Sequence, residues 1–304
     1  MKALTRPIVH MLTGLPASGK STHAKTLDAV RFNLDDMREM HGFGLSNNDK
    51  WAKDKEEAVK EALIRGVIAT VDAGLDVVVD NTHLSPKFPR AIRDRMHGKA
   101  TFKVHSFLDV PIEVCVERDA NRAQSVGEAV ILKLAKSSAG ARKNGWVLDD
   151  DWMNLWPDAK PARMNPHAPF AIVCDLDGTL ALHVARGPYD TSKLETDALN
   201  MAVFETLFHY YMQGTKIILL SGRDEGECRE ATVRWLKAHK VNYDHLFMRP
   251  AGDTRPDYVV KYELFKKHVE PDFYVTFCMD DRDQCVALWR QLKLPTFQVN
   301  YGNF

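Results

Sequence analysis

Predicted strands recur along the first half of the chain, at residues 7–13, 30–38, 76–82 and 104–110. Each contains a short apolar stretch, and those at 30–38 and 76–82 end in polar or charged residues. Longer stretches that mix apolar and charged residues separate the predicted strands. An uninterrupted apolar run is typical of a strand buried on both faces of a parallel sheet, and strands that alternate with helices indicate an α/β fold. The charge-rich, amphipathic stretch from Asp49 to Arg65 predicts one of these helices.

The second half repeats the alternation, with predicted strands at residues 170–173, 216–223 and 276–282. A segment rich in proline lies between the halves. Because repeated prolines prevent a long helix or a central strand, the boundary between two α/β domains is expected there. We predict a first domain at residues 1–155, a linker at 156–168 and a second domain at 169–304.

Three tryptophans, Trp146, Trp152 and Trp156, lie near this boundary. Two interpretations are open: the rings stack on bases, or they anchor the linker against a domain. Anchoring is the favoured interpretation.

Composition sets limits on the class of protein. The chain has 304 residues, 45% of them apolar, which is enough for two cores. Lys plus Arg and Asp plus Glu are both 41, so net charge neither supports nor excludes a nucleic-acid partner. The five cysteines show no metal-binding spacing, and we see no membrane-spanning run. A soluble, cytoplasmic protein without a membrane contact is expected, in the host cytoplasm if the gene belongs to a phage.

Residues 14–22 read GLPASGKST and follow the first predicted strand. This is the P-loop pattern GxxxxGK[ST] in its required strand, loop and helix context. Backbone N–H groups are expected to bind the phosphates of ATP, Lys20 to reach the β and γ oxygens, and the Ser21 hydroxyl to bind Mg²⁺. The alternative is a glycine-rich turn without a ligand. The expected cofactor-binding residues of the loop are Gly14, Ser18, Gly19, Lys20, Ser21 and Thr22.

Charged residues lie at or beyond the ends of the next three predicted strands. Asp35 is a candidate base for an incoming hydroxyl and Arg38 a candidate clamp for an acceptor phosphate, although a helix start with acidic caps explains the pair equally well. Asp80 resembles a Walker B carboxylate and is also counted with the substrate-binding residues; a strand-end cap is the alternative. Arg118 and Arg122 are four residues apart, on one helical face, and are expected to form a lid over the phosphoryl group, with solvated surface arginines as the alternative.

The second domain opens with a pair of carboxylates. Cys174 to Leu180 reads CDLDGTL after an apolar run, which places Asp175 and Asp177 at the carboxyl end of a strand, where α/β sheets bind ligands. One carboxylate is expected to attack phosphorus and the other to handle a proton, with both near Mg²⁺. An ordinary Asp-Gly turn is the alternative. The motif resembles DxDGT of the haloacid dehalogenase superfamily of aspartate-nucleophile phosphatases.

Further polar groups end the later strands. Ser221, Gly222 and Arg223 suit a phosphate oxygen, Lys261 lies in a predicted helix from which it reaches the nucleophile, and the strand at 276–282 supplies two acids for Mg²⁺. Four motifs in the order of that superfamily support the assignment. The expected substrate-binding residues of this domain are Arg186, Ser221, Gly222, Arg223 and Asp257, and the expected metal ligands of the domain are Asp175, Asp177, Asp280 and Asp281.

Taken together, the motifs resemble those of the T4-type bacteriophage polynucleotide kinase/phosphatases over nearly the whole chain. The resemblance implies that Asp35 is the general base on a 5′-hydroxyl, that Arg38 holds the acceptor's 3′-phosphate, and that Arg122 contacts the β/γ-phosphates with support from Arg118. It implies that residues 186–190, RGPYD, bring Arg186 to the substrate phosphate. Residues 123–127 depart from the phage pattern, which leaves the lid contacts open.

The expected function is the healing of RNA or DNA ends: ATP-dependent 5′-phosphorylation and removal of 3′-phosphates, with Asp175 as nucleophile and Asp177 as acid and base. RNA or tRNA repair beside an RNA ligase is the implied setting, and a homo-oligomer is expected because the phage enzyme is a homotetramer. One alternative is a small-molecule kinase fused to a small-molecule phosphatase, since both motif sets address phosphate alone. The other is an end-binding protein with decayed sites.

Overall fold

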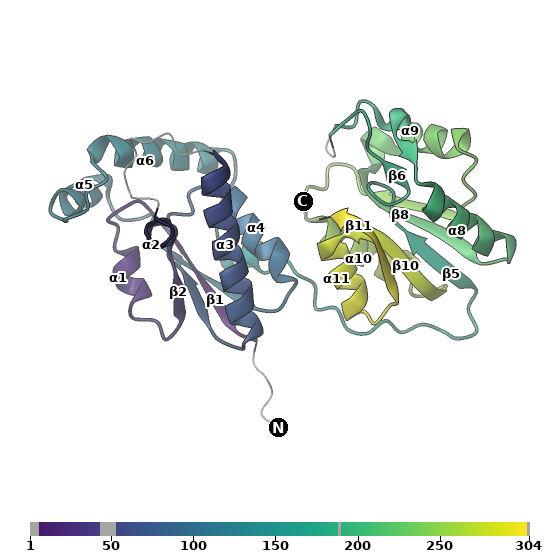
Figure 1. Ribbon diagram of the computed structural model, residues 1–304, viewed down its shortest axis with the longest axis horizontal. Coiled ribbons are helices and arrows are strands. Elements are labelled where there is room, and N and C mark those ends of the chain that lie inside the picture. Colours follow the sequence, from purple (N-terminus) through teal and green to yellow (C-terminus); the bar gives the residue numbers. More distant parts are fainter. Residues whose placement is uncertain (1–5, 43–52, 188–189, 303–304) are drawn as a thin grey trace, which may run out of the picture. The chain divides into compact units, whose positions relative to one another are not determined.

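The computed structural model describes residues 6–42, 53–187 and 190–302. By its internal contacts the chain divides into two compact units, Met1–Leu155 and Trp156–Phe304. Both units are mixed α/β structures built on a parallel sheet flanked by helices (Figure 1). None of the helices in the described ranges is both long and apolar enough to cross a membrane.

The sheet of the first unit has four parallel strands in the order β2-β3-β1-β4. Its core is formed by the apolar runs that predicted the strands, packed against α3 and α4. The strands are β1 (Ile8–Thr13), β2 (Val30–Phe32), β3 (Val77–Val79) and β4 (Thr101–Ser106); the helices are α1 (Lys20–Ala24), α2 (Leu34–Met40), α3 (Lys53–Asp72), α4 (Lys87–Met96), α5 (Ile112–Ala120), α6 (Glu128–Lys143) and α7 (Asp150–Met153).

The main sheet of the second unit has five parallel strands in the order β11-β10-β5-β8-β9. A small antiparallel ribbon, β6 with β7, follows the first strand. The strands are β5 (Phe170–Cys174), β6 (Ala181–Leu182), β7 (Ala198–Leu199), β8 (Lys216–Asp224), β9 (His245–Arg249), β10 (Tyr274–Arg282) and β11 (Thr296–Gly302); the α-helices are α8 (Met201–Met212), α9 (Glu225–Ala238), α10 (Asp257–His268) and α11 (Asp283–Gln291).

Several predicted boundaries were wrong. The strand predicted at 30–38 covers only Val30–Phe32, because α2 begins at Leu34, and the strand predicted at 76–82 covers only Val77–Val79. The fourth strand covers Thr101–Ser106 and stops before Phe107, because the backbone turns there, with Val110 N–H donating to Phe107 O ahead of Pro111. The helix predicted from residue 49 begins at Lys53 in the described range and continues to Asp72; residues 49–52 of that prediction lie outside the described residues.

Residues 154–169 contain neither helix nor strand, and from Trp156 onward they belong to the second unit. The Trp156 indole donates to Gln291 Oε1 at 2.8 Å and its ring lies 4.5 Å from that of Tyr258. Further on, Ala162 N–H donates to Leu292 O. Trp156 therefore anchors this segment, whereas Trp146 and Trp152 pack at the core of the first unit.

Because each unit has its own hydrophobic core, we expect a core substitution in one unit to destabilise that unit alone. Leu63 on α3 is fully buried in the first core. We expect Leu63→Ala to lower the free energy of unfolding of the first unit by about 3 kcal/mol, because it leaves a cavity. Urea unfolding followed by hydrogen exchange in peptides of each unit would measure this. Arg65→Ala, at an exposed position of the same helix, is the control. An equal loss of protection in both units would contradict separate cores.

Candidate active sites

The P-loop lies between β1 and α1. Gly14 is required there, because a Cβ would lie 2.8 Å from Phe107 Cβ, and Gly19 begins α1 in a left-handed conformation with φ of 100°. The Lys20 ammonium donates to Gly14 O at 3.0 Å and Leu15 O at 2.6 Å. Burial lowers the pKa of Lys20 to about 8.

The other loop residues lie where the sequence placed them. Ser18 is buried and its hydroxyl is 3.4 Å from Lys20 Nζ, while Ser21 and Thr22 are exposed in the first turn of α1. The loop thus keeps its lysine folded onto its own carbonyl groups and offers N–H groups and two hydroxyls at a helix start. This is the donor set that a nucleotide triphosphate and its Mg²⁺ need.

At the end of β2, Asn33 and not an aspartate caps α2: its side chain accepts from the N–H groups of Asp35 and Asp36. Asp35 is exposed and forms an ion pair with Arg38. Arg38 also holds Glu56 on α3 through two contacts of 3.0 and 2.7 Å. The sequence thus identified a real pair, and both residues also stabilise the helix.

Asp80 is almost fully buried at the end of β3 and binds the Arg31 guanidinium at 2.9 and 2.8 Å. Its backbone carbonyl accepts from the Asn33 side chain, which ties the ends of β2 and β3 together. Three buried polar atoms here have no hydrogen-bond partner among the described residues: Asp80 Oδ1, Asn81 Nδ2 and His83 Nε2. A free carboxylate oxygen beside the P-loop fits the hydration shell of Mg²⁺.

The predicted arginine face of the lid was wrong. Helix α5 ends at Ala120, so Arg122 lies beyond it, while Arg118 is exposed on its last turn. The cause is Asp119, a buried carboxylate that accepts from Ser125 Oγ at 2.6 Å and Gly127 N–H at 2.9 Å. These bonds turn the chain into α6, and Arg122 folds back onto Asp119 at 2.5 Å.

In the second unit, Lys261 lies at the centre of a group of carboxylates. Its ammonium is 2.8 Å from Asp175 Oδ1, 2.9 Å from Asp280 Oδ2 and 3.4 Å from Asp257 Oδ2, and its side chain is 1% exposed. The three carboxylates raise the pKa of Lys261 well above its usual value although burial opposes this. Lys261 and Arg282 hold the pKa of Asp257 below its usual value, against the effect of burial.

Asp175, Asp280 and Asp281 form a group whose carboxylate oxygens lie within 4.8 Å of one another. Burial and the neighbouring carboxylates raise the pKa of Asp175, and the same causes raise that of Asp281 to about 6. Raised pKa values in a group of neighbouring carboxylates indicate that the positive charge around them does not balance their negative charge. Their oxygen-only chemistry fits Mg²⁺, in agreement with the hard-cation preference for carboxylates.

Asp177 is directed away from this group, and its carboxylate lies instead with the side chains of His183 and Asp197 in a second group of possible ligands. Its carboxylate accepts from Arg223 Nε and Nη2, both at 2.8 Å, and from Arg186 Nη2 at 2.6 Å. Together with His183, these arginines hold the pKa of Asp177 well below its usual range although burial opposes this. The carboxylate is therefore ionised in this arrangement.

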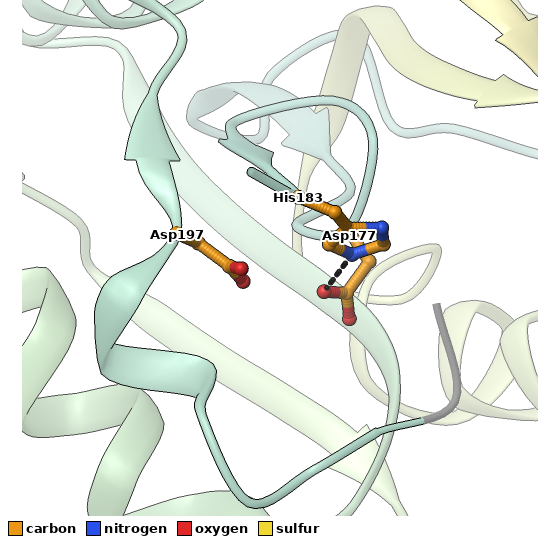
Figure 2. Close-up of side chains that lie close together, drawn as sticks. All are labelled: Asp177, His183 and Asp197. Carbon is orange, nitrogen blue, oxygen red and sulfur yellow. Dashed lines mark hydrogen bonds and ion pairs between the residues drawn. The ribbon is translucent and has the colours of Figure 1, made fainter. Parts of the chain in front are cut away.

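The β6–β7 ribbon adds two residues that the sequence did not single out. His183 follows β6 and its Nε2 is 2.9 Å from Asp177 Oδ1; Asp197 precedes β7 and is fully buried (Figure 2). The Asp197 carboxylate accepts hydrogen bonds from Arg186 Nε at 2.8 Å and from Arg223 Nη2 at 3.2 Å. Asp197 thus fixes both guanidinium groups that also bind Asp177.

The remaining predicted residues are close to these groups. Ser221 Oγ accepts from Arg223 N–H at 3.2 Å. Gly222 lies against Asp257, so that a Cβ there would meet Asp257 Oδ1 at 2.2 Å. Arg249, which the sequence analysis missed, donates to Gly222 O at 2.7 Å and to Asp257 Oδ1 at 3.2 Å.

Fold and sites together define a class: a P-loop kinase-like domain of the AAA type followed by a phosphatase-like domain of the haloacid dehalogenase type. Family models match both units. Residues 169–304 match the polynucleotide kinase PNKP phosphatase domain, and residues 9–139 match the AAA domain.

Individual relatives extend over more of the chain. A chain in the structure of the Pnkp1/Rnl/Hen1 RNA repair complex is 34% identical, with 99% of this chain and 98% of that chain covered and a TM-score of 0.48. A protein of Autographa californica nuclear polyhedrosis virus, named as a bifunctional polynucleotide kinase/RNA ligase, is 28% identical over 94% of this chain. Residues 169–304 therefore belong to the family of polynucleotide kinase PNKP phosphatase domains, and residues 9–139 belong to the AAA domain family.

Other relatives match the first unit alone. An adenylyl-sulfate kinase of Lactiplantibacillus plantarum is 30% identical over 38% of this chain. The chain spans 41% of the length of the viral relative and 58% of the length of this kinase.

Histidine 83 gives the first unit a predicted pH dependence. Its Nδ1 donates to Leu12 O at 2.6 Å, and burial lowers its pKa to about 4 from 6.5. Its contribution to stability is therefore complete above pH 6.5 and is lost as the pH falls toward 4, by about 3 kcal/mol in total. Urea unfolding of the first unit between pH 4.5 and 7.5 should show this slope. His83→Gln should reduce the slope but not remove it, because burial also lowers the pKa of His105 in the same unit to about 4. An unchanged slope in that variant would assign it to other groups.

Proposed function

We propose that the chain heals nucleic-acid ends, adding the γ-phosphate of ATP to a 5′-hydroxyl and hydrolysing a 3′-phosphate. The observation that carries this proposal is the combination of a P-loop with the Asp175–Lys261–Asp280 group in one chain. The match of residues 169–304 to the PNKP phosphatase domain supports the choice of a polynucleotide end over other phosphate esters.

In the kinase reaction, the N–H groups at the start of α1 bind the phosphates of ATP, and Lys20 turns from its own loop carbonyls to the β and γ oxygens. Asp35 accepts the proton of the 5′-hydroxyl, and Arg38 exchanges its contact with Asp35 for the acceptor's phosphate while Glu56 keeps it in place. Arg122 and Arg118 neutralise the transferring phosphoryl group once Arg122 leaves Asp119. Mg²⁺, bound near Ser21 and Asp80, would withdraw charge from the phosphates.

In the phosphatase reaction, Asp175 attacks the 3′-phosphate in line while Lys261 neutralises the developing charge. Water then hydrolyses the resulting aspartyl phosphate. Asp280 and Asp281 would hold Mg²⁺ together with Asp175, and the ion would draw charge from the phosphoryl oxygens. Asp257 keeps Lys261 in place beside the nucleophile.

Binding of the substrate phosphate is expected to change the state of Asp177. Arg186 and Arg223 are the guanidinium groups next to Asp177 that could bind a phosphate. In this structure both form ion pairs with Asp177 and Asp197. A phosphate that shares them, with Ser221 and Gly222, weakens their hold on Asp177, so its proton affinity rises. Asp177 is then able to donate a proton to the leaving oxygen and afterwards to activate water.

The partners of the reaction are RNA or DNA ends, an RNA ligase that joins the healed products, and further copies of this chain in a homo-oligomer. One relative is described as a polynucleotide kinase/RNA ligase and another as part of an RNA repair complex. These descriptions support the nucleic-acid ends and the RNA ligase as partners. A cytoplasmic setting belongs to the same proposal and agrees with five buried free cysteines.

The deciding experiment uses a short RNA with a 5′-hydroxyl and a 3′-phosphate, incubated with ATP and Mg²⁺, with the two ends resolved separately. Change at both ends supports the proposal. Turnover of small phosphorylated metabolites alone would favour a small-molecule enzyme, and binding of the RNA without turnover would favour an end-binding protein.

Lys20→Ala should lower 5′-phosphorylation by on the order of 10²-fold or more, because charge stabilisation of the phosphates is lost. Release of 3′-phosphate should be unchanged, since Lys20 belongs to the first unit. The assay is the RNA reaction above. Lys25→Ala, just beyond the same helix, is the control. Loss of both activities in a folded variant would show that the sites depend on each other.

Asp175→Asn should lower 3′-phosphate release by on the order of 10³-fold or more, because an amide does not attack phosphorus. Phosphorylation of 5′ ends should persist. Asp272→Asn, at an exposed turn before β10, provides a control for the loss of one carboxylate. Wild-type phosphate release by Asp175→Asn would exclude Asp175 as the nucleophile.

A further inference from the structure

Helix α6 carries a stripe of basic residues on its exposed side. Lys133, Lys136, Gly140 and Lys143 are exposed and occupy positions i, i+3, i+7 and i+10, which lie on one side of a helix. No Asp or Glu occurs from residue 129 to residue 148. We call these four residues the α6 stripe.

In the described part of the chain, the lysines of the α6 stripe have no acidic partner, unlike several other basic residues of the unit. Arg38, Arg65 and Arg95 each form an ion pair with a glutamate. Within residues 6–42, 53–187 and 190–302, no ion pair involves a lysine of the stripe. Like charges gathered on one helix face repel one another, and a bound polyanion relieves that repulsion.

A glycine in the middle of the α6 stripe, Gly140, is a second feature that points to a ligand. Glycine inside a helix costs about 1 kcal/mol relative to alanine, so it needs a reason. Packing does not give one, because a Cβ at Gly140 would meet nothing within 4 Å. A helix surface without a side chain at this position allows another backbone to approach between Lys136 and Lys143. An extended anionic chain is the ligand that fits a lysine-rich strip with such an opening.

The position of α6 connects the stripe to the kinase site. On its other side, Ile131 and Leu134 pack in one apolar cluster with Leu15 of the P-loop and Leu84. Figure 1 shows α5 and α6 beyond the carboxyl ends of the strands of this sheet, where the P-loop and the start of α2 lie. The stripe thus lies on a helix that borders the site of phosphoryl transfer.

We propose that the α6 stripe binds the phosphodiester backbone of the acceptor strand, on the 3′ side of its 5′-terminal nucleotide. This rests on the proposed kinase function and adds a binding site outside the reacting groups. From Lys133 to Lys143 the helix rises by about 15 Å, which spans several consecutive phosphates. Recognition of the backbone alone predicts binding without base preference.

The test measures acceptor KM for 5′-hydroxyl RNA and DNA of 2 and 12 nucleotides, at a range of salt concentrations. The variant combines Lys133→Glu, Lys136→Glu and Lys143→Glu. For the 12-mers, KM should rise at least tenfold and the slope of log KM against log salt should fall by about two, as expected for three lost phosphate contacts. For the dimers, kcat and KM should stay within twofold. An effect on RNA alone would identify the 2′-hydroxyl as a further contact.

The control variant, with Lys25→Glu, Lys99→Glu and Lys103→Glu, changes the net charge equally at exposed positions elsewhere on the unit. It should keep the wild-type length and salt dependence. The proposal is overturned if both variants weaken 12-mers equally, or if the stripe variant leaves 12-mers unaffected while wild-type enzyme phosphorylates them. A change in molecular mass alone would make the stripe an interface between copies and would also overturn it. Wild-type enzyme that phosphorylates no oligonucleotide would instead refute the proposed function.

Gly140→Leu separates binding from folding. Leucine favours a helix, so the melting temperature of the variant should rise or stay unchanged. Its side chain would fill the opening of the stripe without changing the charge, and KM for the 12-mers should rise at least threefold while the dimers are unaffected. Unchanged KM for the 12-mers in a stable variant would show that Gly140 takes no part in binding and would count against the proposal.

Discussion

A buried ammonium group that holds three carboxylates together is the interaction on which the second unit depends. Asp175 directly follows β5, Asp280 lies near the end of β10, and Asp257 begins α10. Parallel strands bring their carboxyl ends to one edge, and without Lys261 these acids would repel one another in a site closed to water. The lysine removes only part of the excess charge, as the raised pKa of Asp281 shows. The carboxylates of this edge are held together in the fold although their negative charge is only partly compensated.

The first unit also has to neutralise a buried carboxylate at the carboxyl end of its sheet, and it does so with an arginine. Asp80 is the buried acid at the end of its central strand, and Arg31 from the neighbouring strand neutralises it through one oxygen. The other oxygen has no partner among the described residues. Lys20, the cation of the loop, remains on loop carbonyls and keeps a lowered pKa. In both units, then, the protein places positive charge beside the buried acids without satisfying them completely, as the second oxygen of Asp80 and the raised pKa of Asp281 show.

Much of this could be predicted from sequence because its causes are local. Buried parallel strands need apolar runs, and the P-loop and DxDGT motifs are consecutive residues whose geometry follows from a strand and a turn. The prolines predicted a linker at residues 156–168, and the internal contacts assign these residues to the second unit. What escaped prediction depends on contacts between distant residues. Asp119 ends α5 by binding the loop after it, so Arg122 leaves the helix face that its spacing suggested. His183 and Asp197 meet Asp177 only because β6 pairs with β7, and two-residue strands leave no periodic signal.

The direction of Asp177 shows why the chemistry of a site does not follow from its residue types alone. Spacing placed it one residue beyond Leu176 and near the metal-binding acids, yet two arginines fixed by Asp197 turn its carboxylate toward them. A carboxylate held by two guanidinium groups is a poor acid, since ionisation is what those groups favour. The same guanidinium groups are the natural partners of a phosphate. A residue whose proton affinity is set by groups that the substrate also needs responds to the arrival of that substrate. In the proposed phosphatase reaction, the proton affinity of Asp177 would therefore depend on whether the site is occupied. The buried carboxylate of Asp197 keeps both arginines in position beside Asp177.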